Sequence, residues 1–160
     1  MEKISYQKIS SPIGDLWIIG SDEELYTILF DEEELKREWI DAVEKETPVL
    51  KETVRQLHEY FQGERSHFQV PLKLKGTAFQ KTVWNQLQTI EYGKTKSYGE
   101  IAELIGNPKA VRAVGQANRA NPVPIIIPCH RVIGKNQKLV GYAGNRIELK
   151  ETLLKLESTI

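Results

Sequence analysis

The chain has 160 residues, with 22 Lys or Arg, 22 Asp or Glu and a single cysteine. No apolar stretch approaches the roughly 20 residues that span a bilayer, and one cysteine forms no internal disulfide, so the composition excludes a membrane protein and a disulfide-stapled domain. Residues 1–4 contain no signal-peptide core, and we therefore expect a cytoplasmic protein that does not contact a membrane.

The charges are divided unevenly between the two halves of the chain. Residues 1–75 carry 10 basic and 16 acidic side chains, whereas residues 76–160 carry 12 basic and 6 acidic ones. Charged residues usually form a solvated surface, but a split of this kind gives one half an attractive field for polyanions.

Residues 1–75 predict a small α/β domain on an antiparallel sheet. Segments rich in β-branched or aromatic residues lie at 4–7, 16–19 and 25–30. Turn residues between the first two, at 11–14, indicate a meander of about three strands. Residues 67–70 alternate like an edge strand.

Two helices are expected to cover this sheet. The first is a charged segment over residues 32–43, and the second begins at Thr47, a cap residue followed by Pro48 at the first helical position. Their apolar positions are Leu35, Trp39 and Ile40, and then Leu50, Val54, Leu57 and Phe61. Residues 73–76 are a linker, which places the domain boundary after residue 75.

Residues 76–160 predict a mostly helical domain with a helix-turn-helix at about 97–119. Thr77 begins a helix over residues 78–88. The sequence from Ser97 to Glu100 has the form of a capping box, which opens a helix over 98–105, and a second helix is expected over 108–119 with Asn107 as its cap.

The second helix of this motif combines small and basic side chains. Val111 and Val114 are expected in the core, and small residues on the remaining surface of the helix would allow close approach to a nucleic-acid backbone. The basic residues are Lys109, Arg112 and Arg119, and the small ones are Ala110, Ala113, Gly115 and Ala117. An ordinary helical hairpin with an alanine-rich packing face remains an alternative.

The only cysteine, Cys129, follows an apolar run at residues 125–127 and Pro128. Prolines at 122, 124 and 128 restrict the backbone, so this run delivers the thiol to a fixed place. A hairpin, or wing, is expected over residues 131–142, and an amphipathic helix over 147–157 closes the chain.

A thiol at neutral pH needs a base to become a nucleophile, and His130 is the neighbouring candidate, acting directly or through a water. A lone cysteine in a reducing compartment is more often a small core residue. The proline-restricted turn and the basic helix-turn-helix beside it favour the reactive interpretation.

The motif around the thiol resembles that of the methylated-DNA–protein-cysteine methyltransferases. Pro128-Cys129-His130-Arg131-Val132 is similar to the active-site signature of that family, and the resemblance extends over residues 76–157. It implies a ribonuclease H-like α/β domain at residues 1–75 and a winged helix-turn-helix domain at 76–160, with the active-site turn at 128–132.

The resemblance also implies the reaction and its residues. Cys129 would accept the alkyl group of a flipped 6-O-alkylguanine, or of 4-O-alkylthymine, in a single turnover. His130 would draw the thiol proton through a water, and Glu157 would orient the imidazole. Tyr98 would donate a hydrogen bond to the leaving guanine, and Asn121 would be the hinge between the helix-turn-helix and the active-site turn.

The partner implied is double-stranded DNA with an alkylated guanine. Arg112 would fill the gap in the base stack. The other DNA-binding residues would be Lys109, Ala110, Ala113 and Arg119, and the base pocket would consist of Pro124, Val132, Tyr142 and Ala143.

Some members of the family hold a zinc ion partly through cysteines of the N-terminal domain, and no cysteine stands there in this chain, so we expect no metal and no cofactor. We expect a monomer, with cooperative binding on DNA left open. Two other hypotheses remain: a DNA-binding module that senses lesions without reacting, and a cysteine hydrolase or acyltransferase built on Cys129, His130 and Glu157.

Overall fold

The computed structural model describes residues 3–134 and 147–158. The chain divides into two compact units, Met1–Leu74 and Lys75–Ile160. No helix within the described ranges is long and apolar enough to cross a bilayer.

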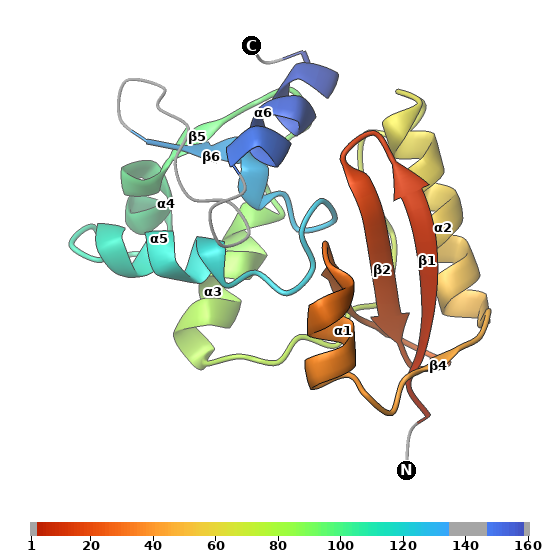
Figure 1. Ribbon diagram of the computed structural model, residues 1–160. Helices are drawn as coiled ribbons and strands as arrows, with labels where there is room; N and C mark the ends of the chain where they lie inside the picture. The colour runs from red at the N-terminus through yellow and green to blue at the C-terminus, as the bar shows by residue number, and fades with distance from the viewer. Residues whose placement is uncertain (1–2, 135–146, 159–160) are drawn as a thin grey trace. The chain divides into compact units, whose positions relative to one another are not determined.

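The first unit contains a four-stranded sheet (Figure 1). Strands β1 (Ser5–Ser11), β2 (Gly14–Gly20) and β3 (Leu25–Leu29) form the predicted antiparallel meander. A short β4 (Val43–Glu44), which the sequence did not suggest, pairs in parallel with β1, so the order is β3-β2-β1-β4 and the sheet is mixed.

Both faces of β2 are covered. Trp17 and Ile19 pack with Leu35 of α1 (Glu32–Glu38) on one face. Leu16 and Ile18 point to the opposite face, because side chains alternate along a strand, and α2 (Pro48–Phe61) packs against the sheet and runs alongside β1 and β2 in Figure 1. Coverage of both faces explains why this strand reads as a continuous apolar run.

Helix α1 is shorter than predicted, because residues 32–43 offer it little to bury. Trp39 already leaves the helical conformation, with φ −127°. Ile40 and Val43 are 77% and 62% exposed, so beyond Leu35 no apolar stripe holds a further turn on the sheet.

Helix α2 begins as predicted, and the Thr47 hydroxyl accepts from the Leu50 amide. Its buried face is rotated from the predicted one: Val54 and Phe61 are only half-buried. The buried side chains are Leu50, Thr53, Gln56, Leu57 and Tyr60.

Gln56 exchanges two hydrogen bonds with the backbone of Gln69, at 2.9 and 3.0 Å. These bonds hold residues 67–70 without strand pairing, so the predicted edge strand there is wrong. The extended pairing falls instead at Leu72, which bridges to Leu25.

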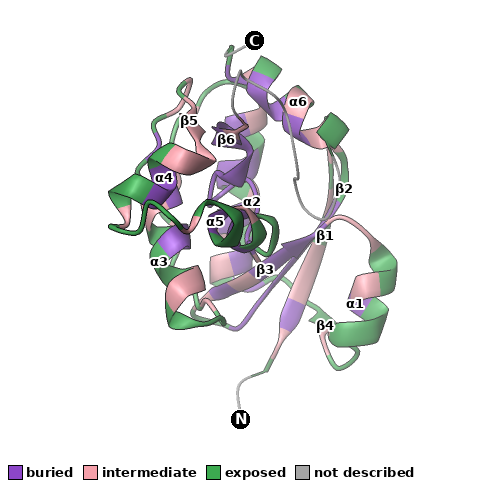
Figure 2. Ribbon diagram, turned by 90° about the vertical axis from the view of Figure 1, so that its left-hand side faces the viewer, coloured by how far each residue is buried: buried purple, intermediate pink, exposed green. Residues whose placement is uncertain are grey.

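The second unit is mainly helical. Its helices are α3 (Ala78–Leu87), α4 (Tyr98–Leu104), α5 (Val111–Arg119) and α6 (Ile147–Leu156), with a 3-10 turn η1 (Cys129–Arg131) and short strands β5 (Lys96–Ser97) and β6 (Val132–Ile133). Helices α3 and α4 both pack on α5, and α6 packs on η1. The chain around β6 is largely buried (Figure 2).

Helix α5 begins three residues later than predicted. Ala110 is its N-cap, and Asn107 caps no helix but accepts the Ala110 amide through its backbone carbonyl, in a separate turn. The shift leaves Val111 40% exposed, so its expected place in the core is wrong, whereas Val114 is fully buried.

The predicted wing is only partly visible. Strand β6 pairs in parallel with β5 rather than opening a hairpin, and the second strand expected for the wing lies outside the described residues.

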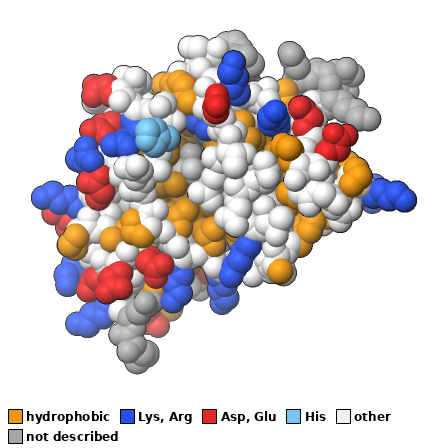
Figure 3. Space-filling view, turned by 180° about the vertical axis from the view of Figure 1, so that it is seen from behind, with side chains coloured by type: hydrophobic (Ala, Val, Ile, Leu, Met, Phe, Trp, Pro, Cys, Tyr) orange, Lys and Arg blue, Asp and Glu red, His pale blue; other side chains and the backbone are white. Residues whose placement is uncertain are grey.

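Acidic and basic side chains are interspersed on the face seen in Figure 3. Helix α2 carries exposed ion pairs: Arg55 pairs with Glu52 and also with Glu59, the latter at 2.8 Å.

Candidate active site

The turn that carries Cys129 is held by its own backbone and by Asn121. The Ile127 amide donates to the Val123 carbonyl at 2.9 Å, and the Asn121 side chain donates to the Ile127 carbonyl at 2.8 Å and accepts from the Val123 amide at 2.9 Å. Ile125 has φ +75°, an unfavourable value for a β-branched residue. The segment is therefore a strained turn, and the hydrogen bonds of Val123 and Ile127 hold it on either side of Ile125.

Cys129 is 1% exposed. Its carbonyl accepts from the Asn118 side chain of α5 at 3.3 Å, which ties the turn to the helix-turn-helix. Burial raises the pKa of the thiol to about 11, although interaction with the Asn121 amide and the charge of Lys150 oppose the rise. The resting sulfur is therefore a thiol and needs a base.

His130 is fully buried and lies beside that thiol in sequence. Its Nε2 lies 2.7 Å from Oε2 of Glu157. Burial lowers the pKa of His130 against the opposing pull of Glu157, so the ring is neutral at pH 7. The carboxylate only accepts, hence Nε2 carries the proton and Nδ1 is the basic nitrogen.

Glu157 follows the last residue of α6 and is 3% exposed. Arg131 donates to both of its oxygens, at 2.8 and 3.0 Å. Burial raises the pKa of Glu157, but the hydrogen bonds from His130 and Arg131 outweigh it and hold the pKa at about 2. The structure thus joins His130, Arg131 and Glu157 in one hydrogen-bonded cluster, and Cys129 precedes His130 in the buried turn.

Tyr98, the first residue of α4, is half-buried near this cluster. Burial and the nearby Cys129 raise its pKa to about 12, so the phenol keeps its proton. Lys150 of α6 lies 3.5 Å from the hydroxyl.

The predicted DNA-binding residues lie on the outside of the motif. Arg112, Ala113 and Arg119 are exposed on α5, whereas Val114, Ala117 and Asn118 form its buried side. Lys109 is exposed in the turn before α5, and Ala110 is half-buried.

Of the predicted pocket residues, Pro124 and Val132 are buried, and Tyr142 and Ala143 lie outside the described residues. Among residues 3–134 and 147–158, no group of three or more His, Cys, Asp or Glu side chains is placed to hold a metal ion.

Three buried polar residues of this cluster were not singled out from the sequence: Asn118, Arg131 and Lys150. Lys150 stands three and four residues before Leu153 and Leu154, on the same helical face as Glu157. Asn118 likewise follows the buried Val114 by four. A polar residue on an apolar face was the available signal for both; Arg131 had none in its local pattern.

Two family models match this chain. The model of the 6-O-methylguanine DNA methyltransferase DNA-binding domain matches residues 78–159, and that of the ribonuclease-like domain of the same proteins matches residues 4–74. The chain belongs to the 6-O-methylguanine DNA methyltransferase family. The resemblance noted from the motif around Cys129 is confirmed, as is the ribonuclease-like fold of the N-terminal part.

Other members of the family are similar over nearly their whole length. The constitutive methylated-DNA–protein-cysteine methyltransferase of Bacillus subtilis is 51% identical over 156 residues, which cover 95% of this chain and 94% of that protein. A methyltransferase of the same name from Methanosarcina acetivorans is 50% identical, with 96% and 98% covered.

A solved family member, the Mycobacterium tuberculosis O6-methylguanine methyltransferase, superposes with a TM-score of 0.87 at 44% identity, over 98% of this chain and 93% of that one. The same organism's OGT has been solved in complex with DNA and superposes with a TM-score of 0.86 at 46% identity, over 97% and 93%.

Proposed function

We propose that this chain repairs DNA by moving the alkyl group of 6-O-alkylguanine irreversibly onto Cys129, in a single turnover and without a cofactor. The observation that carries the proposal is the buried Cys129 of a strained turn, followed directly by His130, whose imidazole is bound to Glu157. Each molecule is consumed by one lesion, because a thioether is not readily reversed.

The chemistry follows from the protonation states of the cluster. Nδ1 of His130 takes the thiol proton, through a water where it is not in direct reach, and Glu157 stabilises the imidazolium that forms. Sulfur attacks the methyl carbon, the S–C bond forms, and the C–O bond breaks with its electron pair left on guanine. Tyr98 donates its phenolic proton to that base, which gives neutral guanine, and the phenolate takes a proton back from solvent.

Access to the sulfur requires that the base leave the helix. Extrusion costs a few kcal/mol and is easiest for a damaged, poorly paired base. Arg112 on the exposed side of α5 fills the vacated place in the stack, while Lys109 and Arg119 meet phosphates. Binding to DNA therefore weakens as salt rises.

We place this reaction in the cytoplasm, because a free thiol that is used once has to stay reduced until a lesion arrives.

The Cys129 residue is 1% exposed, so a base reaches Sγ only by displacing neighbouring atoms. Asn118 and Asn121 hold the turn around this thiol through side-chain hydrogen bonds to the carbonyls of Cys129 and Ile127.

The test is the intact mass of the protein after incubation with a duplex that carries 6-O-methylguanine. Wild type should gain one methyl group per molecule, mapped to Cys129, and Cys129→Ala should gain none while still binding the duplex. A wild-type protein that binds the lesion but gains no mass is a lesion sensor, and turnover of a thioester without any need for DNA would identify a hydrolase; either result overturns the proposal.

A further inference from the structure

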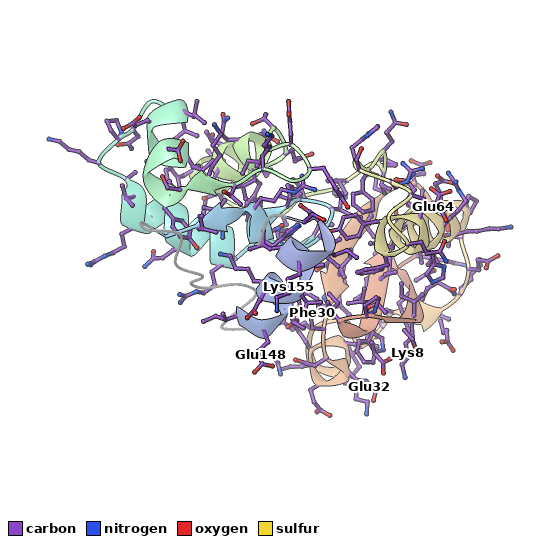
Figure 4. The ribbon with its side chains drawn as sticks, turned by 90° about the horizontal axis from the view of Figure 1, so that it is seen from above. Lys8, Phe30, Glu32, Glu64, Glu148 and Lys155 are labelled. Carbon is purple, nitrogen blue, oxygen red and sulfur yellow. The ribbon has the colours of Figure 1, made fainter. Side chains whose placement is uncertain are left out.

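Asn118 is a fully buried asparagine on the inner side of α5. Polar side chains are ordinarily buried only where hydrogen-bond partners meet their donor and acceptor groups. Side chains that reach solvent find such partners in water: Glu148 and Lys155 of α6, labelled in Figure 4, are exposed. The partners of the Asn118 amide therefore indicate what this residue does inside the unit.

The donor half of this amide is paired. Its Nδ2 donates to the Cys129 carbonyl at 3.3 Å. The opposite orientation of the amide would set Oδ1 against that carbonyl, and two acceptors repel each other, so the places of the two atoms are fixed. Oδ1 has no protein partner among the residues that the structure describes. A buried acceptor in this state costs free energy, which a hydrogen-bond donor on a bound ligand would recover.

The amide lies beside the two residues that the reacting base must touch, Cys129 and Tyr98. Burial and the charge of Cys129 raise the pKa of Tyr98 to about 12, and the charge of Arg119 and a hydrogen bond with Asn118 oppose the rise. A hydrogen bond that lowers the pKa of a phenol is donated to its oxygen, so it also comes from Nδ2 and does not use Oδ1. The Tyr98 ring lies along the same helix, because a Cβ at Gly115, one turn before Asn118, would come within 3.9 Å of it.

The substrate has one group that can pair with Oδ1. In 6-O-alkylguanine N1 carries no hydrogen, because alkylation of the oxygen fixes the ring in its enol-ether form, and N9 is bound to the sugar. The exocyclic 2-amino group is therefore the only N–H donor of the base. It lies on the same edge as the alkylated oxygen, with N1 between them, so it stays close to Cys129 when the alkyl carbon meets the sulfur.

We propose that Asn118 is a specificity-determining residue, whose Oδ1 accepts a hydrogen bond from the 2-amino group of the extruded guanine while Nδ2 holds the Cys129 carbonyl. The inference rests on the proposed function and adds one residue to it. A base that lacks the amino group leaves Oδ1 unpaired in the complex, and an unpaired buried group is what lets a site reject a close analogue. The matching analogue is 6-O-methylhypoxanthine, which differs from 6-O-methylguanine only in this amino group.

The experiment measures single-turnover methyl transfer from two duplexes, one with each lesion, in wild type, Asn118→Leu and the control Asn121→Ala. Leucine has nearly the shape of asparagine but no acceptor. The ratio of the guanine rate to the hypoxanthine rate should be about ten-fold lower in Asn118→Leu than in wild type, the effect of one hydrogen bond. Differences between the lesions in base pairing and leaving-group strength cancel, because all three proteins meet the same duplexes.

Asn121→Ala is the matched control, since both ends of the Asn121 amide are bound within the turn. It should slow transfer from the two lesions equally and keep the wild-type ratio. An Asn118→Leu protein that is slower on both lesions but keeps the wild-type ratio overturns the inference, because Asn118 then only supports the turn. Absence of transfer from 6-O-methylguanine in wild type defeats the proposed function instead.

A second measurement serves if Asn118→Leu does not fold or does not react. The ¹⁵N signal of the Asn118 side-chain amide is followed in Cys129→Ala bound to each of the two duplexes. The signal should differ between them, since only the guanine lesion donates to Oδ1, and identical signals overturn the inference.

Discussion

Arg131 holds Glu157 by both carboxylate oxygens, through Nε to Oε1 at 2.8 Å and Nη2 to Oε2 at 3.0 Å. Its third donor, Nη1, binds the carbonyl of Ile90 after α3 at 2.7 Å. One guanidinium therefore connects α3, η1 and the end of α6. Because Oε2 also accepts from His130, Arg131 sets the orientation of the imidazole from the far side of the carboxylate.

Replacing Arg131 by Lys should lower the free energy of unfolding by about 2 kcal/mol, because a lysine cannot make the forked contact and leaves buried acceptors unpaired. Urea denaturation at pH 7 measures the change. Arg55→Lys on α2 is the matched control: it also pairs with two glutamates, but at an exposed site, and should have a much smaller effect. Equal losses in the two variants would contradict a structural role for the buried fork.

Acid should destabilise the protein through Glu157. Its pKa is 4.5 when unpaired and about 2 in the folded state, so the folded form binds fewer protons between these values. The stabilisation is present above pH 4.5 and is lost as pH falls towards 2, at most about 3 kcal/mol. Glu157→Gln should reduce the loss of stability between pH 5 and 3 in denaturant titrations. Glu151→Gln, at an exposed site on the same helix, should reproduce the wild-type dependence.

Asn121→Ala should both destabilise the protein and slow transfer. Two buried hydrogen bonds of the active-site turn end on this side chain, and the orphaned Ile127 carbonyl and Val123 amide should cost about 2 kcal/mol or more. Loss of the bonds also frees the turn, so the transfer rate should fall even at temperatures where the variant is folded. An exposed asparagine of the same unit, Asn107, should tolerate alanine in both measurements.

Arg112→Ala should separate extrusion of the base from the chemistry. Arg112 is exposed on α5 and makes no contact with the thiol cluster in the described structure, so transfer from the free 6-O-methylguanine base should be unchanged. Transfer from duplex should slow by about ten-fold or more, since the extruded state loses the group that fills the stack. Lys81→Ala on α3 controls for loss of one positive charge. Equal slowing on both substrates would assign Arg112 to the reaction centre instead.

Local sequence determined where a helix begins when its N-cap is formed by residues close in the chain. The caps at Thr47 and Thr77 and the capping box Ser97–Glu100 form as predicted, because each needs only residues three positions apart. The motif at residues 128–132 likewise indicated Cys129 and His130 as candidate site residues, and both are buried in the structure. By contrast, α1 and α5 have different bounds from those expected, since what they could bury depends on partners distant in the chain.

Only the tertiary structure decided which polar side chains lie inside. Arg131 and Lys150 were not predicted to be buried, yet they are 6% and 0% exposed. Their burial is stabilised by groups up to 52 residues away, such as Tyr98 for Lys150. Hydrophobic periodicity predicts which face of a helix is buried. It does not predict which charges and hydrogen-bond partners a polar residue on that face will have in the folded protein.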